Sequence, residues 1–255
     1  MLFNQIAYGT IHSRRLGTSL GMEIMPLEHK LCTFNCVYCE CGWNEKVQHP
    51  VLPTRQEVHD ALEAKLQEIK ANNEPLDVIT FSGNGEPTLH PEFKAIIADT
   101  CALRDRYCPE VKVSVLSNST QLGRADVVEA LRMCDKRILK LDAATDTMMR
   151  RIDKPVNEGL DVETIIRWLE QFEGDFILQT CFLRGEHNGE RIDNTTEEEL
   201  NAWYQAVDRL HPKQIMIYVI DRKTPEESLE KIAPETMHAI AQPLKEKGYE
   251  VIVSC

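Results

Sequence analysis

Three cysteines with the spacing of metal ligands lie in one short stretch of this chain. Cys32, Cys36 and Cys39 form the pattern C-x3-C-x2-C. In a chain with no secretory signal pattern, cysteines this close together serve a metal site or redox chemistry. Cysteine thiolates from such runs hold iron–sulfur clusters. Three thiolates leave one iron of a four-iron cluster open, and an open coordination position distinguishes a catalytic metal site from a structural one.

Other roles for the cysteines fit the sequence less well. A zinc ion could use Cys41 or His29 as a fourth ligand, but structural zinc sites usually pair two C-x2-C elements and this chain has only one. A disulfide framework is disfavoured by the odd total of nine cysteines. An iron–sulfur site is therefore our first interpretation, and a zinc module or an electron carrier is the alternative.

A glycine-rich turn follows a predicted buried strand over 77–81. The turn contains Gly83, Asn84, Gly85 and Glu86. Glycines at the carboxyl end of a strand let the backbone approach a ligand closely. Pro87 biases Glu86 towards extended geometry, which aims its carboxylate outward.

Polar residues also end two later predicted strands. Ser117 and Asn118 end a strand over 111–118, where an Asx turn is the alternative to a ligand role. Lys140 and Asp142 end a strand over 137–142 and share one of its faces, because side chains alternate along a strand. Charges at such positions need either a partner or a site.

The cysteine spacing, with Tyr38 just before the last cysteine, resembles the radical S-adenosylmethionine (SAM) superfamily. In that family the open iron is chelated by the amino and carboxylate groups of SAM. One electron from the cluster cleaves the sulfonium and leaves a 5′-deoxyadenosyl radical, which takes hydrogen from a substrate. The resemblance implies a [4Fe–4S] cluster on the three cysteines, with SAM as the second cofactor.

The resemblance also implies a set of SAM contacts. The glycine turn looks like the family's Gly-Gly-Glu motif, with Asn84 inserted between the glycines, and Lys140 and Asp142 match the end of the family's fourth strand. The SAM-contacting residues implied are Tyr38, Gly83, Asn84, Gly85, Glu86, Ser117, Asn118, Lys140 and Asp142.

Strands alternate with helices over 20–220, which predicts an α/β fold with a parallel sheet and outer helices. Six βα units match the partial (β/α)6 TIM-type barrel of radical SAM enzymes, and the motifs lie at carboxyl strand ends, where barrels keep their sites. We predict a single domain over 1–255. It has an N-terminal arm over 1–18, a core over 19–220, and a C-terminal helix and strand over 221–255.

Within the superfamily, the motifs are most similar to the branch that includes wyosine-type transfer-RNA base synthases. The shared stretches are 13–17, 19–21, 83–89 and 140–143. Wyosine synthases carry further N-terminal cysteines for a second cluster, whereas this chain has no cysteine before Cys32.

Several residues remain as candidates for handling a substrate at the barrel mouth. Cys181 is a candidate catalytic hydrogen donor on a predicted strand over 175–183. Polar loops are predicted over 150–155 and 184–189. The candidate substrate contacts are Arg14, Arg15, Gln179 and Arg222.

The composition limits the partners. A net charge of −12 disfavours binding to a nucleic-acid backbone without forbidding it. No apolar run is long enough for a membrane span, and we expect cytoplasmic residence. The function predicted is oxidoreductase chemistry on an unidentified substrate, with a flavodoxin or ferredoxin as low-potential electron donor. Wyosine-type tRNA modification and activation of a partner protein are alternatives.

Overall fold

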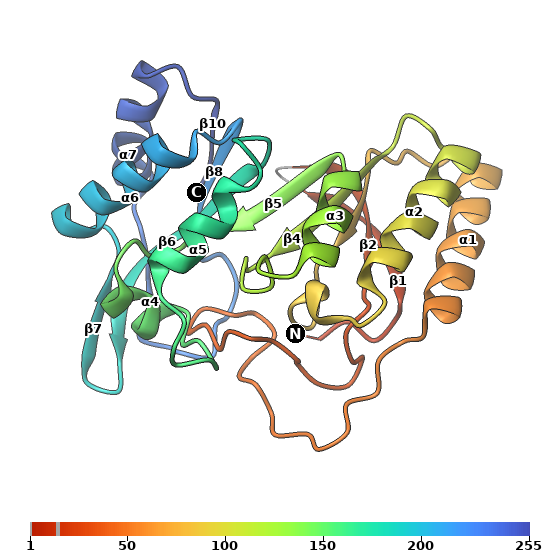
Figure 1. Ribbon diagram of the computed structural model, residues 1–255, viewed down its shortest axis with the longest axis horizontal. Helices are drawn as coiled ribbons and strands as arrows, with labels where there is room; N and C mark the ends of the chain where they lie inside the picture. The colour runs from red at the N-terminus through yellow and green to blue at the C-terminus, as the bar shows by residue number, and fades with distance from the viewer. Residues whose placement is uncertain (1, 14–15) are drawn as a thin grey trace. The chain divides into compact units, whose positions relative to one another are not determined.

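The computed structural model describes residues 2–13 and 16–255 (Figure 1). The chain forms two compact units. The first contains Met1–Cys32, Asn44–Ser117 and Gln121–Ile138, and the second contains Thr33–Trp43, Asn118–Thr120 and Leu139–Cys255. The single domain over 1–255 stays a prediction.

The first unit combines a sheet with three α-helices. Its strands pair in the order β1 (Ala7–Ser13), β2 (Gly17–Met22), β3 (Val78–Phe81) and β4 (Lys112–Ser117). Its helices are α1 (Arg55–Asn72), the short 3-10 helix η1 (Pro87–Leu89), α2 (Phe93–Tyr107) and α3 (Ala125–Met133). The pairs β2–β3 and β3–β4 are parallel, as expected for βα units.

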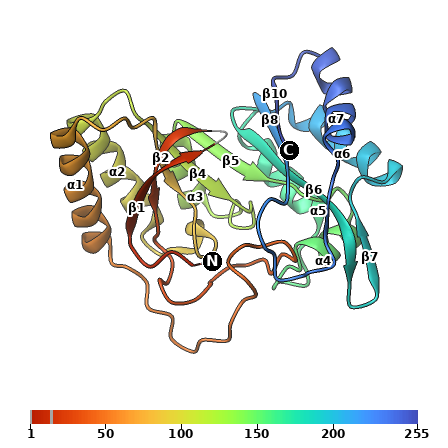
Figure 2. The ribbon, with the colours of Figure 1, turned by 180° about the vertical axis from the view of Figure 1, so that it is seen from behind.

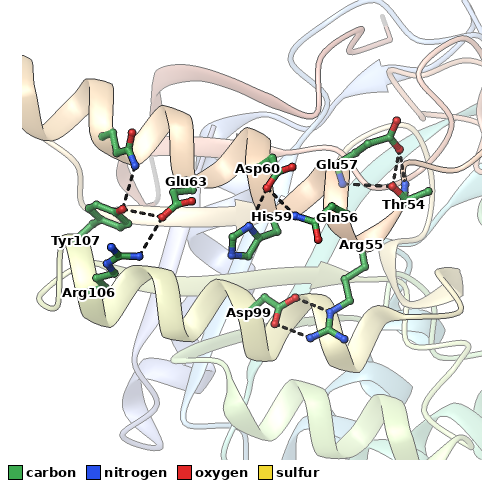
Figure 3. A network of polar contacts seen from close by, with 11 residues as sticks. Thr54, Arg55, Gln56, Glu57, His59, Asp60, Glu63, Asp99, Arg106 and Tyr107 are labelled. Carbon is green, nitrogen blue, oxygen red and sulfur yellow. Dashed lines mark hydrogen bonds and ion pairs between the residues drawn. The ribbon is translucent and has the colours of Figure 1, made fainter.

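Helix α1 is capped at its first turn and buries one apolar face. Thr54 caps its first turn by accepting from the N–H of Glu57, whose carboxylate bonds back to the Thr54 N–H, forming a capping box. The buried face of α1 consists of Val58, Leu62, Leu66 and Ile69. A polar network joins the outer sides of α1 and α2, including the bidentate ion pair between Arg55 and Asp99 (Figure 3).

The N-terminal arm predicted over 1–18 is wrong in part, because β1 pairs with β2 in antiparallel fashion. The register shifts between Tyr8 and Ile11, next to Gly9 at φ +92°. A Cβ on Gly21 would lie 2.2 Å from the Tyr8 ring, so the ring packs directly on the backbone of β2. The polar composition of β1 hides it in the sequence, since a strand at the end of a sheet is half exposed to solvent.

The second unit contains the other strands and four helices. Its strands are β6 (Ile177–His187), β7 (Glu190–Asp193), β8 (Gln214–Val219), β9 (Glu230–Lys231) and β10 (Val251–Ser254), and β5 (Lys136–Lys140) runs into it from the first unit. Its helices are α4 (Asp146–Ile152), α5 (Val162–Glu170), α6 (Glu197–Leu210) and α7 (Pro234–Glu246). The pairs β6–β8 and β8–β10 are parallel. Figure 2 shows β6 and β7 as one long antiparallel hairpin.

Two predicted loops of the second unit are regular structure instead. The basic loop over 150–155 begins inside α4, a helix too short to show a helical period in the sequence, which Thr145 caps. The polar loop over 184–189 continues β6 and turns at Asn188-Gly189, both at positive φ. Asn-Gly is a strong hairpin signal, and the sequence analysis missed it.

The predicted fold class is confirmed. Both units are α/β, with parallel strand pairs and helices beside them. Among the residues that the structure describes, no helix is long and apolar enough to cross a membrane.

Candidate functional site

The cysteine loop, defined as Thr33–Trp43, belongs to the second unit, and Cys32 precedes it. Its backbone is bonded to the end of α4. The N–H of Asn35 donates to the Asp153 carbonyl at 2.8 Å, and the N–H of Val37 donates to the Ile152 carbonyl at 2.9 Å. These bonds on either side of Cys36 fix the path of the loop.

The thiols of the motif are all free of disulfides. Cys36 is buried, and its Sγ lies 3.4 Å from Oδ1 of Asp153. Cys32 and Cys39 are half-buried. The motif therefore offers three thiols from one continuous stretch, of which the middle one contacts a buried carboxyl group.

Tyr38, Lys140 and Asp142 form one polar cluster in the second unit. The Tyr38 hydroxyl donates to Oδ2 of Asp142 and accepts from the Lys140 ammonium. Lys140 also pairs with Asp142 at 3.4 Å and lies 4.8 Å from the centre of the Tyr38 ring. The charged pair on one face of the strand end therefore has a partner, and that partner is the aromatic residue of the cysteine motif.

Burial and mutual charge shift the pKa values in this cluster. Burial raises the pKa of Tyr38 well above its ordinary value, and the Asp142 charge adds to the shift. Burial lowers the pKa of Lys140, but the negative charges around it, of which Asp142 contributes most, together outweigh burial and the pKa rises well above its ordinary value. Burial, reinforced by Asp142, also raises the pKa of Asp153. Tyr38 therefore stays neutral and Lys140 stays charged at neutral pH.

The glycine turn, defined as Ser82–Glu86, lies in the first unit directly after β3. Gly83 and Gly85 have φ values of +125° and +154°. A Cβ on Gly83 would lie 2.1 Å from Oε2 of Glu23, and one on Gly85 would lie 1.8 Å from the carbonyl oxygen of Leu31. Glycine is therefore required at both positions, because the Glu23 carboxylate and the Leu31 carbonyl occupy the space that a side chain would need.

Glu23 is a fully buried carboxylate beneath this turn. One oxygen accepts from the N–H of Asn84 at 2.6 Å, and the other accepts from the N–H of Met25 at 2.7 Å. Burial raises the pKa of Glu23 from 4.5 to about 7, against the opposing effect of these backbone bonds.

Glu86 is buried at the end of the turn, with 2% of its surface exposed. Its Oε1 accepts from the Ser117 hydroxyl at 2.8 Å and from the N–H of Thr88 at 3.2 Å. The structure thus brings together two residues predicted to contact SAM, Glu86 and Ser117, from the ends of neighbouring strands.

Asn118 lies in the second unit and forms the Asx turn that the sequence allows. Its Oδ1 accepts from the N–H of Thr120 at 3.1 Å, and its Nδ2 donates to the Thr33 hydroxyl at 2.9 Å. The Asn118 side chain therefore anchors the start of the cysteine loop, and its contact with SAM stays a prediction.

Cys181 and Gln179 lie two residues apart on β6 and are both buried. The N–H of Cys181 donates to Oδ1 of Asp142 at 2.7 Å. Burial and the Asp142 charge raise the pKa of the Cys181 thiol, which a hydrogen bond with Tyr218 opposes. Their proposed roles in catalysis and substrate contact stay predictions.

The remaining candidate substrate contacts are arginines. Arg222 is largely exposed and pairs with Glu40 of the cysteine loop at 2.7 Å. Arg14 and Arg15 lie outside the described residues.

A search against protein-family models matches residues 29–193 to the radical SAM superfamily. The chain belongs to this superfamily. The match covers more than half of the chain, including the cysteine motif, the glycine turn and the Tyr38 cluster.

The chain is also similar to curated proteins over part of their length. The chain is 30% identical over 217 residues to UPF0026 protein slr1464 of Synechocystis, covering 82% of this chain and 73% of that protein. It is 30% identical to UPF0026 protein MJ1312 of Methanocaldococcus jannaschii, covering 77% and 60%. It is 29% identical to a protein named GTPase Obg of Brachyspira hyodysenteriae, covering 90% and 32%. The chain spans only about a third of that last protein.

Solved structures share the fold at low identity. A TYW1 structure with a bound lysine-pyruvate adduct has a TM-score of 0.63 at 17% identity, covering 91% of this chain and 74% of that one. A radical SAM methyltransferase from Sphaerobacter thermophilus also has a TM-score of 0.63, at 13% identity, covering 92% and 66%. These likenesses show that the chain has the radical SAM fold, the partial TIM-type barrel predicted from sequence.

The donor set fits the cluster that radical SAM proteins typically use. Three thiols, none of them in a disulfide, stand on one stretch with family spacing. Among the described residues, no three His, Cys, Asp or Glu side chains converge as tightly as ligands of one ion do. A four-iron cluster needs wider spacing, because each thiolate binds a different iron.

Sequence reasoning missed three residues that organise these radical SAM elements. They are Glu23 beneath the glycine turn, Asp153 beside Cys36, and Asn194, whose Nδ2 donates to the Asp142 carbonyl at 2.7 Å. Only Glu23 had a usable signal, since an acidic residue between apolar residues at a strand end must find partners.

Proposed function

We propose that this enzyme reductively cleaves SAM and abstracts a hydrogen atom from a substrate. When bound, a [4Fe–4S] cluster and SAM supply a one-electron cleavage that gives a 5′-deoxyadenosyl radical. The observation that carries the proposal is the cysteine triplet near the start of the matched family region, whose three thiols form no disulfide.

The residues of the chain have separate tasks in this proposal. Cys32, Cys36 and Cys39 would ligate three irons as thiolates. Glu86 would accept a hydrogen bond from the amino group of SAM, since an ionised carboxylate is a strong acceptor for an N–H donor. Ser117 holds that carboxylate in one orientation through its 2.8 Å hydrogen bond.

The test is a cleavage assay on anaerobically reconstituted protein with dithionite and SAM. We expect 5′-deoxyadenosine and methionine in equal amounts. Cys36→Ala should lose iron and all cleavage, whereas Cys41→Ala is the matched control and should retain both. A colourless zinc protein, or full cleavage by Cys36→Ala, would overturn the proposal.

The substrate class follows from the same assay with labelled candidates. Deuterium transferred into 5′-deoxyadenosine from a small molecule, from a tRNA base or from a partner protein's backbone identifies the hydrogen donor. The net charge of −12 disfavours unaided tRNA binding. We further propose a flavodoxin or ferredoxin as electron donor. We propose the reducing cytoplasm as the compartment, because it suits an oxygen-sensitive cluster and nine cysteines that form no disulfide.

A further inference from the structure

Backbone groups of the glycine turn are hydrogen-bonded to residues that precede the cysteine motif. The carbonyl of Asn84 accepts from the N–H of Leu31 at 2.9 Å, and the N–H of Glu86 donates back to the Leu31 carbonyl at 3.1 Å. Leu31 immediately precedes Cys32. The turn and the start of the cysteine motif are therefore held in one register within the first unit.

The Asn84 side chain faces the protein interior and is fully buried. Its Nδ2 donates to the carbonyls of Phe3 at 2.7 Å and Pro26 at 3.0 Å, and its Oδ1 accepts from the Phe3 N–H at 2.8 Å. These bonds use both Nδ2 hydrogens and the side-chain oxygen. The inserted residue of this Gly-Asn-Gly-Glu turn thus serves the fold with its side chain.

Glu23 holds the other side of the same residue. Its carboxylate accepts from the N–H of Asn84, and the space it occupies excludes any side chain at Gly83. A buried carboxylate accepting main-chain N–H groups forms directional, charge-assisted hydrogen bonds. Between them, Glu23 and the Asn84 side chain leave the turn one backbone path.

We propose that Glu23 and Asn84 are positioning residues for Glu86, fixing the glycine turn so that the Glu86 carboxylate is presented to the amino group of SAM. This inference rests on the proposed function. It assigns to Glu23 a role that neither the motif nor the family match contains. Because the hydrogen bonds of Glu23 and Asn84 are made within the protein alone, they are in place before SAM binds.

The first measurement is hydrogen–deuterium exchange of the turn without SAM. Glu23→Gln preserves the size of the side chain but replaces one acceptor oxygen with an NH2 group, so one N–H loses its partner. We expect faster exchange in peptides that cover 78–90 in this variant. Glu199→Gln is the matched control, because Glu199 is also buried and accepts from the N–H of Ala144 at 3.1 Å in the second unit. It should leave exchange in the turn unchanged.

The second measurement is the dissociation constant of SAM on reconstituted protein with equal iron content. Glu23→Gln should weaken binding about tenfold, the effect of one lost charge-assisted hydrogen bond, and Glu199→Gln less than about twofold. If Glu23→Gln does not fold, Glu23→Asp replaces it, because the shorter side chain keeps the carboxylate but moves its oxygens away from the N–H groups of Asn84 and Met25.

The two proposals fail in different ways. If wild-type protein neither binds nor cleaves SAM, the proposed function is wrong. Hydrogen–deuterium exchange without SAM still tests whether Glu23 fixes the glycine turn. If wild-type protein binds SAM and the Glu23 variant matches the Glu199 control in both measurements, the positioning role is wrong.

Discussion

The cysteine loop and the glycine turn differ in the forces that fix them. In the second unit, the loop is anchored by charged and polar side chains, since Tyr38 is bonded to the buried pair of Lys140 and Asp142. In the first unit, the side chains of Glu23 and Asn84 anchor the turn by hydrogen bonds to main-chain groups. The first anchor is a buried ion pair between side chains, whereas the second consists of side-chain hydrogen bonds to main-chain groups.

This difference predicts different responses to mutation. Removing one member of a buried ion pair leaves the other charge without compensation, so the penalty is large. Removing one acceptor from a set of backbone hydrogen bonds leaves one neutral N–H without a partner, which costs about 1–3 kcal/mol. A single substitution in the ion pair that anchors the loop should therefore cost more free energy of unfolding than a single substitution among the hydrogen bonds that anchor the turn.

The largest expected effect comes from Asp142→Ala. The change leaves the Lys140 ammonium without its anion and the N–H of Cys181 without an acceptor. We expect a loss of about 3 kcal/mol in the free energy of unfolding, measured by urea denaturation. The double variant Lys140→Met, Asp142→Leu removes both charges and should recover much of that loss. A loss below about 1 kcal/mol for Asp142→Ala would contradict charge balance as the anchor.

The second effect is a pH dependence of stability from Glu23. Its pKa is raised from 4.5 to about 7 in the folded protein, so its proton contributes stability that is fully present below pH 4.5. That contribution is lost as the pH rises through about 7. Relative to Glu23→Gln, wild-type protein should lose about 3 kcal/mol between pH 4.5 and pH 8. Parallel curves for the two proteins in urea melts would show that Glu23 does not titrate this way.

A smaller effect is expected from Ser117→Ala. The change removes one donor to Glu86, but Thr88 still donates to the same oxygen. We expect SAM to bind about threefold more weakly by calorimetry, less than for Glu23→Gln. Ser114→Ala is the matched control on the same strand, because the buried Ser114 hydroxyl has no hydrogen-bond partner. An effect as large for Ser114→Ala would point to disturbed strand packing.

The smallest effect is expected from Arg55→Ala. Its ion pair with Asp99 is bidentate at 2.6 and 2.8 Å but exposed to water (Figure 3). Solvent-exposed pairs contribute little to stability. The midpoint of thermal unfolding should stay within experimental error of wild type. A clear drop in that midpoint would show that the ion pair between α1 and α2 also contributes to the stability of the fold.

The contrast between the two anchors also shows what the sequence could reveal. Cysteine spacing and the glycine turn are local patterns, and helices such as α1 show their period, so the family, the fold class and these motifs are predictable. The partners of these motifs come from distant positions. Asp153 lies 117 residues from Cys36, and Glu23 lies 61 residues from Asn84. No local pattern encodes such pairings, because they arise only when the strands pack.

Edge and hairpin strands were missed for a related reason. β1 and β7 alternate poorly between apolar and polar residues, since much of their surface faces water. For β7, the sequence signal is the Asn188-Gly189 turn before it, which predicts a hairpin, and not the pattern of the strand itself.

The contact between Phe3 and Asn84 ties the beginning of the described chain to the glycine turn, and the positioning role proposed for Asn84 then extends to Phe3. Phe3 uses both its N–H and its carbonyl on an amide 81 residues downstream, and its ring stacks on Tyr8 at 3.9 Å. Trimming or proteolysis that removes Phe3 would thus act at a distance, leaving the iron ligands intact while slackening the grip on the sulfonium cofactor. Protein that has lost Phe3 by proteolysis should show the full absorbance of the cluster but low SAM-cleavage activity.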